Sequence, residues 1–292
     1  MAGPAEPEAF SVQADSFSLA GEQAAPEGAA EATIVLLHGL TATRRYVVHR
    51  SRTLPRAGFR LIGYDARGHG ESGPAPEETY DYEHLAADCG EVIAARVGEG
   101  RPVLAGHSMG AHTIASYALR EPDGVAAVVL IGPAVTGEPA SEETLEYWAP
   151  LADGLERDGV EGFIEAYGPT LNPDWRDTIL RFTRERLEAH RHPEAVAQAL
   201  REVPSSRPFE GLEELEALDV PALVVASHDV ADPAHPYAVA AAWAQRLPRA
   251  RLISEDEGES PLAWQGGQLS RAIADFCAED AVRERLSSGL PE

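Results

Sequence analysis

One pentapeptide has the residue types and spacing of a nucleophile held on a sharp turn. It reads Gly106-His107-Ser108-Met109-Gly110 and follows an apolar run over residues 102–106. A serine between a buried strand and a helix lies beside backbone N–H groups that favour a developing negative charge. Glycines on both sides are needed because the backbones pack closely around such a turn. We therefore predict Ser108 as a nucleophile, with its neighbour His107 as a substrate-binding residue and not a base.

A second polar segment, His38-Gly39-Leu40, directly follows the apolar run that ends at Leu37. An attacked carbonyl needs two N–H donors for its negative oxygen, one from the residue after the nucleophile and one from an earlier loop. We expect Met109 to supply the first donor and Leu40 the second. His38 is predicted to stiffen this loop by hydrogen bonding and is a candidate substrate-binding residue.

A third loop, Asp65-Ala66-Arg67-Gly68-His69-Gly70-Glu71-Ser72, completes a series of motifs through which the chain resembles the α/β-hydrolase family. That family carries a His-Gly loop, a loop of this third kind and Gly-X-Ser-X-Gly in the same order. The resemblance implies a mostly parallel sheet flanked by helices, with a helical cap over the active site. In the family the third loop is mostly structural, so we do not expect His69 to carry protons.

The resemblance also implies a catalytic acid. In the family, the strand after the cap leads into Gly-X-X-Asp-X-X-X-Pro, and the aspartate orients a histidine. The matching segment here runs from Ala226 to Pro233, and Asp229 stands in register with that aspartate. Asp232 is a competitor, whose alternative role is a turn or helix-capping carboxylate before Pro233.

The usual base is missing. The family places a histidine after the last strand, but the matching segment here carries Glu259, and no histidine follows His235. One hypothesis is that His235 replaces the base from the acid loop, oriented by Asp229 or Asp232. A second is that Glu259 acts as base or orients water, although a carboxylate with a pKa of about 4 is a weak base unless burial raises it. A third is that hydrolysis has been lost.

The elements that position these residues follow from hydrophobic patterning. Strands alternate with helices along the chain, which predicts a parallel sheet with right-handed crossovers. An edge hairpin is expected over 10–19. The expected strands are 33–37, 59–64, 102–106, 125–131, 220–226 and 251–254, and the expected helices are 44–56, 82–97, 109–119, 237–247 and 268–285.

Residues 137–211 contain no strand pattern and are predicted to form a helical cap, with a kink or a division expected at Pro150. We therefore predict an α/β-hydrolase core from residues 1–136 and 212–292, with the cap inserted between the two parts.

Composition narrows the function further. The net charge of −24 excludes nucleic acid and anionic membranes as partners, and no run is long enough to span a membrane. All 24 basic residues are arginine, so a lysine Schiff base or a phosphate-loop lysine is impossible. Cys89 and Cys277 fit a reducing cytoplasm. We expect neither a cofactor nor a metal, and the oligomeric state stays open, a homo-oligomer included.

Together these features predict a cytoplasmic serine hydrolase for a small ester, thioester or lactone, with a non-standard or impaired triad. The alternative is a ligand-binding member of the same fold that does not hydrolyse its ligand.

Overall fold

Strand β3, Ala32–Leu37, consists mostly of apolar residues and is covered on both of its faces. The computed structural model describes residues 6–229, 232–256, 264 and 266–288. Its eight strands lie in the order β1-β2-β4-β3-β5-β6-β7-β8, and every pairing from β4 to β8 is parallel, whereas β1 and β2 are antiparallel. The strands are β1 Glu8–Ala14, β2 Phe17–Ala24, β3 Ala32–Leu37, β4 Phe59–Tyr64, β5 Val103–His107, β6 Ala127–Ile131, β7 Ala222–Val225 and β8 Ala250–Ile253.

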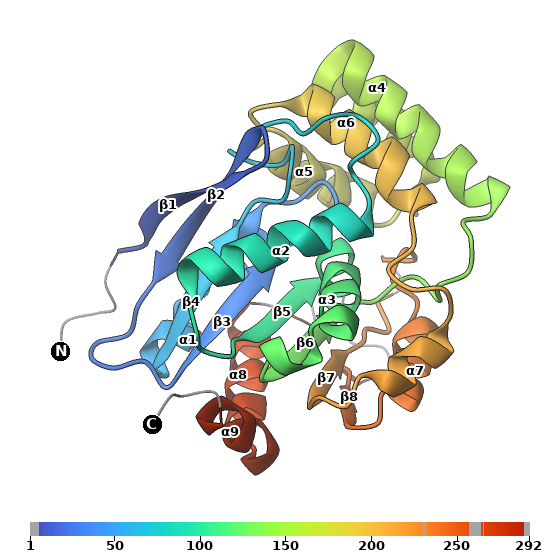
Figure 1. Ribbon diagram of the computed structural model, residues 1–292. Helices are drawn as coiled ribbons and strands as arrows, with labels where there is room; N and C mark the ends of the chain where they lie inside the picture. The colour runs from blue at the N-terminus through green and yellow to red at the C-terminus, as the bar shows by residue number, and fades with distance from the viewer. Residues whose placement is uncertain (1–5, 230–231, 257–263, 265, 289–292) are drawn as a thin grey trace.

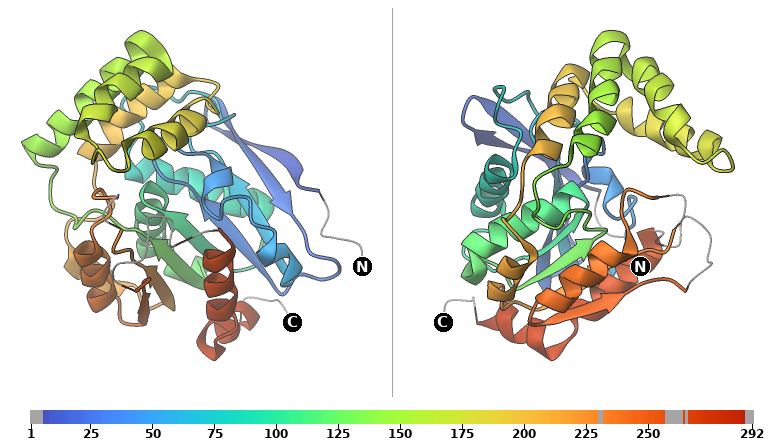
Figure 2. Two further views of the ribbon diagram at one scale, coloured as in Figure 1. Left: turned by 180° about the vertical axis from the view of Figure 1, so that it is seen from behind. Right: turned by 90° about the vertical axis from the view of Figure 1, so that its right-hand side faces the viewer.

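Helices cover both faces of this sheet (Figures 1 and 2). Alternate strand residues point to opposite faces, so Val35 joins one apolar cluster and Leu36 the other. The first cluster packs against α2, α3 and α7, and the second against α1, α8 and α9. These helices are α1 Thr53–Arg56, α2 Tyr82–Arg96, α3 Met109–Arg120, α7 Tyr237–Arg246, α8 Gly266–Cys277 and α9 Asp280–Ser287.

In the sequence, three further helices come between β6 and β7. In space, they lie over one edge of the sheet (Figure 1). They are α4 Glu142–Tyr167, α5 Arg176–Leu187 and α6 Pro193–Glu202. Leu155 of α4, Leu187 of α5 and Leu200 of α6 are buried in one apolar cluster of their own. The sheet therefore carries a helical insertion, and the predicted fold class, a mostly parallel sheet flanked by helices with a helical insertion, is confirmed.

Three local predictions were wrong. The single helix expected over 44–56 is a short 3₁₀ turn, Arg44–Tyr46, followed by α1, because His49 and Arg50 adopt the left-handed region (φ 47° and 58°). The helix expected over 268–285 is divided into α8 and α9 by the extended backbone of Glu279. Within α4 the backbone leaves helical angles at Gly159 (φ 65°, ψ −148°), a conformation open to glycine, and not at Pro150.

A buried ion pair joins the loop after β4 to α2. Arg67 donates from Nε and Nη2 to the two carboxylate oxygens of Asp88, at 2.7 and 2.8 Å, and both side chains are almost fully buried. Removing one partner of such a pair leaves an uncompensated charge in the interior.

We predict that Asp88→Ala lowers the free energy of unfolding by about 3–5 kcal/mol, because the Arg67 guanidinium would lose both charged acceptors. Urea denaturation followed by tryptophan fluorescence measures the loss. The control is Glu216→Ala, which removes the exposed Arg246–Glu216 pair and should change the midpoint little. Equal effects of the two substitutions would contradict the structural role of the buried pair.

Candidate active site

Ser108 lies on a strained turn between β5 and α3. Its backbone angles are φ 52° and ψ −115°, a region that residues other than glycine rarely adopt. The Ser108 N–H donates to the Ile131 carbonyl at 2.9 Å, which ties the turn to the end of β6. Helix α3 begins at the next residue, so the turn stands at the carboxyl edge of the parallel strands.

Close packing around this turn explains the glycines of the motif. A Cβ on Gly106 would overlap the Gly110 carbonyl group, and a Cβ on Gly110 would overlap the Leu37 carbonyl oxygen. A Cβ on Gly39 would lie 2.9 Å from His107 Nδ1 and 3.4 Å from the Ser108 Cβ. The loop after β3 therefore lies directly against the serine turn.

The predicted oxyanion donors belong to these two segments. Met109 is the first residue of α3, and Leu40 follows Gly39 on the neighbouring loop. In the described ranges, neither backbone N–H has a hydrogen-bond acceptor. Two N–H groups without acceptors beside one serine could bind the oxygen of an attacked carbonyl.

Backbone hydrogen bonds occupy both ring nitrogens of His38. Nδ1–H donates to the Gly39 carbonyl at 2.8 Å, and Nε2 accepts from the Ala66 N–H at 2.9 Å. Burial lowers the pKa of His38, so the neutral form that these two bonds require is favoured. This geometry favours a positioning role for His38 in the loop over contact with a substrate.

His235 lies beside the serine turn. Its ring centroid is 4.9 Å from that of His107, and its Cδ2 lies 3.4 Å from where a Cβ of Gly132, the residue after β6, would stand. Burial and the charge of His235 lower the pKa of His107 to about 3, so His107 stays neutral. His107 thus gives His235 an uncharged neighbour at the serine turn.

Asp232 orients His235. Its Oδ2 lies 2.8 Å from His235 Nδ1, and the His235 N–H bonds back to the Asp232 carbonyl at 3.3 Å, so a single turn holds the pair. Burial alone would raise the pKa of Asp232, but the hydrogen bond and charge of His235 outweigh it and lower the value. An ionised carboxylate on Nδ1 leaves Nε2 of His235 as the nitrogen that can accept a proton.

The structure describes one of the other two carboxylates predicted at the site. The backbone N–H of Asp229 donates to Ser227 Oγ at 3.0 Å, and the described hydrogen bond of His235 goes to Asp232. The geometry therefore favours Asp232 over Asp229 as the orienting acid. Glu259 lies outside the described residues.

The Ser108 hydroxyl itself has no hydrogen-bond partner among the residues described. No hydrogen bond among the described residues joins it to His235 Nε2, and catalytic hydrogen bonds are often long before a substrate binds. Ser108 and the His235–Asp232 pair therefore share one edge of the sheet, and no hydrogen bond among the described residues closes them into a triad.

Sequence reasoning missed Glu255, which fixes the loop that carries the acid. Its Oε1 accepts from Ser227 Oγ and from the His228 N–H, both at 2.6 Å. Glu255 comes two residues after β8 ends, so a carboxylate just beyond a strand was the available signal. Arg186, in the insertion, was also missed, because nothing in the sequence separates it from the other arginines.

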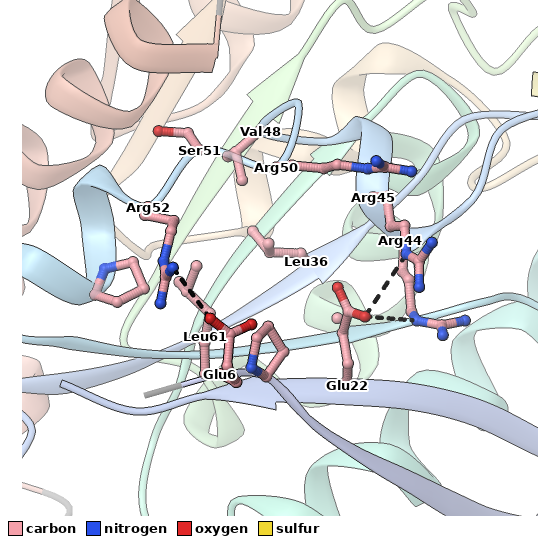
Figure 3. A pocket seen from close by; sticks show the side chains of 14 residues that line it. Glu6, Glu22, Leu36, Arg44, Arg45, Val48, Arg50, Ser51, Arg52 and Leu61 are labelled. Carbon is pink, nitrogen blue, oxygen red and sulfur yellow. Dashed lines mark hydrogen bonds and ion pairs between the residues drawn. The ribbon is translucent and has the colours of Figure 1, made fainter. Parts of the chain in front are cut away.

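A hollow of about 310 Å³ lies apart from this site, between β2, β4 and the loop before α1 (Figure 3). Four arginines line it, but Arg44 and Arg45 approach Glu22, and Arg52 approaches Glu6. Neither Ser108 nor His235 lines this hollow. Glu22 and Glu6 already face three of the four guanidinium groups, and we do not assign the hollow to the active site.

The described part of the chain holds no group of three or more His, Cys, Asp or Glu side chains that could bind a metal. No helix within those residues is long and apolar enough to cross a membrane.

His112 is a buried structural residue near the site. It bonds through Nδ1 to the Tyr82 hydroxyl at 2.8 Å, and through Nε2 it accepts from the Ala134 N–H at 2.9 Å. Burial is the main cause that lowers its pKa from 6.5 to about 3. The folded chain therefore holds His112 neutral at pH values where the unfolded chain would protonate it.

We predict that His112 makes folding acid-sensitive. Above pH 6.5 the contribution of neutral His112 to the free energy of unfolding is fully present. This contribution is lost as the pH falls from 6.5 towards 3. The slope is about 1.4 kcal/mol per pH unit below the unfolded pKa. Urea denaturation between pH 7.5 and 4 should show His112→Gln with a shallower dependence by about that amount, whereas the half-exposed His192→Gln should keep the wild-type slope. Equal slopes in all three proteins would contradict the prediction.

Comparison with known proteins assigns this chain to a family. A family model described as the alpha/beta hydrolase fold matches residues 32–265. The "Putative carbamate hydrolase RutD" of Rhizobium rhizogenes is 30% identical over 228 residues, which cover 77% of this chain and 84% of that protein.

Solved structures agree on the fold. A thermophilic esterase from Thermogutta terrifontis has a TM-score of 0.75 at 23% identity and covers 97% of this chain and 100% of its own. The enol-lactonase from Burkholderia xenovorans LB400 has a TM-score of 0.73 at 24% identity, with 92% and 100% covered. With the family model spanning most of its length, this chain belongs to the α/β-hydrolase family.

Proposed function

We propose that this chain is a serine hydrolase of the carboxylic ester type, acting on a small ester, thioester or lactone. One observation carries the proposal: Ser108 stands on a strained turn near the Asp232–His235 pair, beside two N–H groups that have no acceptor among the described residues. Similar proteins whose names denote a carbamate hydrolase, an esterase and an enol-lactonase support cleavage at a carbonyl carbon.

In the proposed acylation step, Ser108 Oγ attacks the substrate carbonyl carbon and passes its proton to His235 Nε2. The carbonyl oxygen becomes negative and accepts hydrogen bonds from the Leu40 and Met109 N–H groups. Asp232 holds the imidazolium through Nδ1–H and stabilises its charge. When the tetrahedral intermediate collapses, the proton on His235 goes to the leaving alcohol or thiol, and an acyl-serine remains.

Deacylation repeats these steps with water. His235 Nε2 removes a proton from a water molecule, whose oxygen attacks the acyl carbon while the same two N–H groups hold the oxyanion. Collapse returns the proton to Ser108 and releases the acid. These steps need no group beyond the side chains and backbone of this chain.

The origin of the base is the unusual part of the proposal. His235 and Asp232 come from the same loop after β7, three residues apart, so one short turn would supply both base and acid. His107 would contribute by staying neutral, because a charged ring in contact with His235 would oppose its protonation.

Site variants test these roles with chromogenic 4-nitrophenyl butanoate. We expect Ser108→Ala and His235→Ala each to lower kcat/KM by about 10³-fold or more, and Asp232→Asn by roughly 10²–10⁴-fold, because nucleophile, base and acid act as a unit. Asp229→Asn should cost less than about tenfold. His192→Ala, a histidine of the insertion outside the proposed site, is the matched control and should keep wild-type turnover.

Labelling with a fluorophosphonate separates hydrolysis from ligand binding without turnover. Intact-mass spectrometry should find one adduct on the wild type, mapped to Ser108, and none on Ser108→Ala. Full activity of His235→Ala would refute the proposed base. A wild type that neither reacts with the probe nor cleaves the ester would instead favour the ligand-binding alternative.

A further inference from the structure

Arg186 is a half-buried arginine of α5 that has no carboxylate partner among the described residues. Its Nε is buried with no hydrogen-bond acceptor, and its described hydrogen bond runs from Nη2 to Thr183 Oγ1 at 3.2 Å. None of the carboxylates in the described ranges lies within ion-pair distance of it. By contrast, Arg184 on the same helix pairs with Glu161.

Hydrogen bonds join the segment that follows α5 to the loop that contains Leu40, one of the two proposed oxyanion donors. His190, four residues after Arg186, donates from Nε2 to the carbonyl of Thr41 at 3.0 Å, and Thr41 directly follows Leu40. The Gly70 N–H donates to His190 Nδ1 at 2.8 Å, and the Arg191 N–H donates to the Gly70 carbonyl at 2.8 Å. Three hydrogen bonds thus hold this part of the insertion on the core, next to the serine turn.

The Arg186 charge acts on the proposed catalytic groups. It contributes to lowering the pKa of His107 and of Asp232, so the guanidinium lies within electrostatic range of both. Burial lowers the pKa of Arg186 itself, and this is only partly offset by Tyr167, Asp232 and Tyr46. The Asp232 carboxylate is hydrogen-bonded to His235 and does not pair with Arg186.

A guanidinium whose Nε is buried without an acceptor is unfavourable. Desolvation opposes the burial of a charged group, and hydrogen bonds to an anion are what normally offset it. A buried polar atom without a partner calls for an explanation such as an absent ion or ligand. Because this chain has a net charge of −24, an anionic ligand would also need a local cation to approach the site.

We propose that Arg186 binds a carboxylate of the substrate, so that the enzyme acts on esters or lactones that carry a free carboxylate. This inference rests on the proposed hydrolase function and adds the substrate class. The guanidinium offers a planar pair of N–H donors that fits a carboxylate. Bound there, the carboxylate would hold the substrate under the insertion while its ester carbonyl meets Ser108.

Two esters that differ mainly in charge test the proposal: mono-4-nitrophenyl adipate and 4-nitrophenyl hexanoate. We expect Arg186→Gln to raise KM for the adipate ester at least about tenfold while changing kcat less, and to change KM for the hexanoate ester by less than about threefold. Arg181→Gln, which removes an exposed arginine of the same helix, is the matched control and should leave both KM values unchanged.

Stability gives an independent readout. Removal of a half-buried charge that has no carboxylate partner among the described residues should leave Tm unchanged or raise it, whereas a structural role for Arg186 would lower it. An Arg186→Gln protein with a lower Tm and equal KM changes for both esters would overturn the proposal. Hydrolysis of both esters with no charge-dependent effect of Arg186→Gln would overturn it while leaving the proposed hydrolase function intact.

If neither ester is cleaved, calorimetric titration of adipate decides the matter separately from catalysis. Weaker binding to Arg186→Gln than to the wild type and Arg181→Gln would support a carboxylate site, even though the proposed hydrolase function had failed. Equal binding to all three proteins, or no binding to the wild type, would refute the site.

Discussion

The backbone of Ser108 is the constraint on which the rest of the site depends. A left-handed serine between a strand and a helix is unfavourable in isolation, and here it persists because its neighbours leave no other arrangement. Gly106, Gly110 and the Leu37 carbonyl meet without room for a Cβ, and the Ile131 carbonyl holds the Ser108 N–H. Packing in the sheet core thus stabilises the strained backbone of Ser108. In this conformation the Ser108 side chain lies at the carboxyl edge of the sheet.

Neutral histidines hold the loops around this turn. His38, His112 and His190 each join two partners through their two nitrogens, which requires one protonated and one bare ring nitrogen. Burial, which lowers the pKa of all three, favours that form. His235 differs, because a carboxylate binds its Nδ1 and no described group binds its Nε2. That difference is why we propose His235, and not the other three, as the proton carrier.

The sequence predicted what depends on local pattern. Apolar strands, the Gly-X-Ser-X-Gly turn and the absence of strands in the insertion each have a short-range signature, and the order of motifs supplied the family. The break after Tyr46 and the division of α8 from α9 were missed because single residues in extended or left-handed conformations leave a hydrophobic pattern intact. The Asp232–His235 bond and the Arg186 Nε, which has no acceptor in the described part of the chain, depend on side-chain directions set by tertiary packing, which spacing alone does not determine.

A crystal structure of the wild-type protein after reaction with a small fluorophosphonate would test the proposed roles of Ser108 and His235. We expect a covalent bond from phosphorus to Ser108 Oγ, with a phosphoryl oxygen about 2.7–3.1 Å from the Leu40 and Met109 nitrogens. We also expect His235 Nε2 within hydrogen-bond distance of Ser108 Oγ, with Asp232 still on Nδ1. An adduct at another residue, or one at Ser108 with His235 turned away and a different base in contact, would contradict these roles.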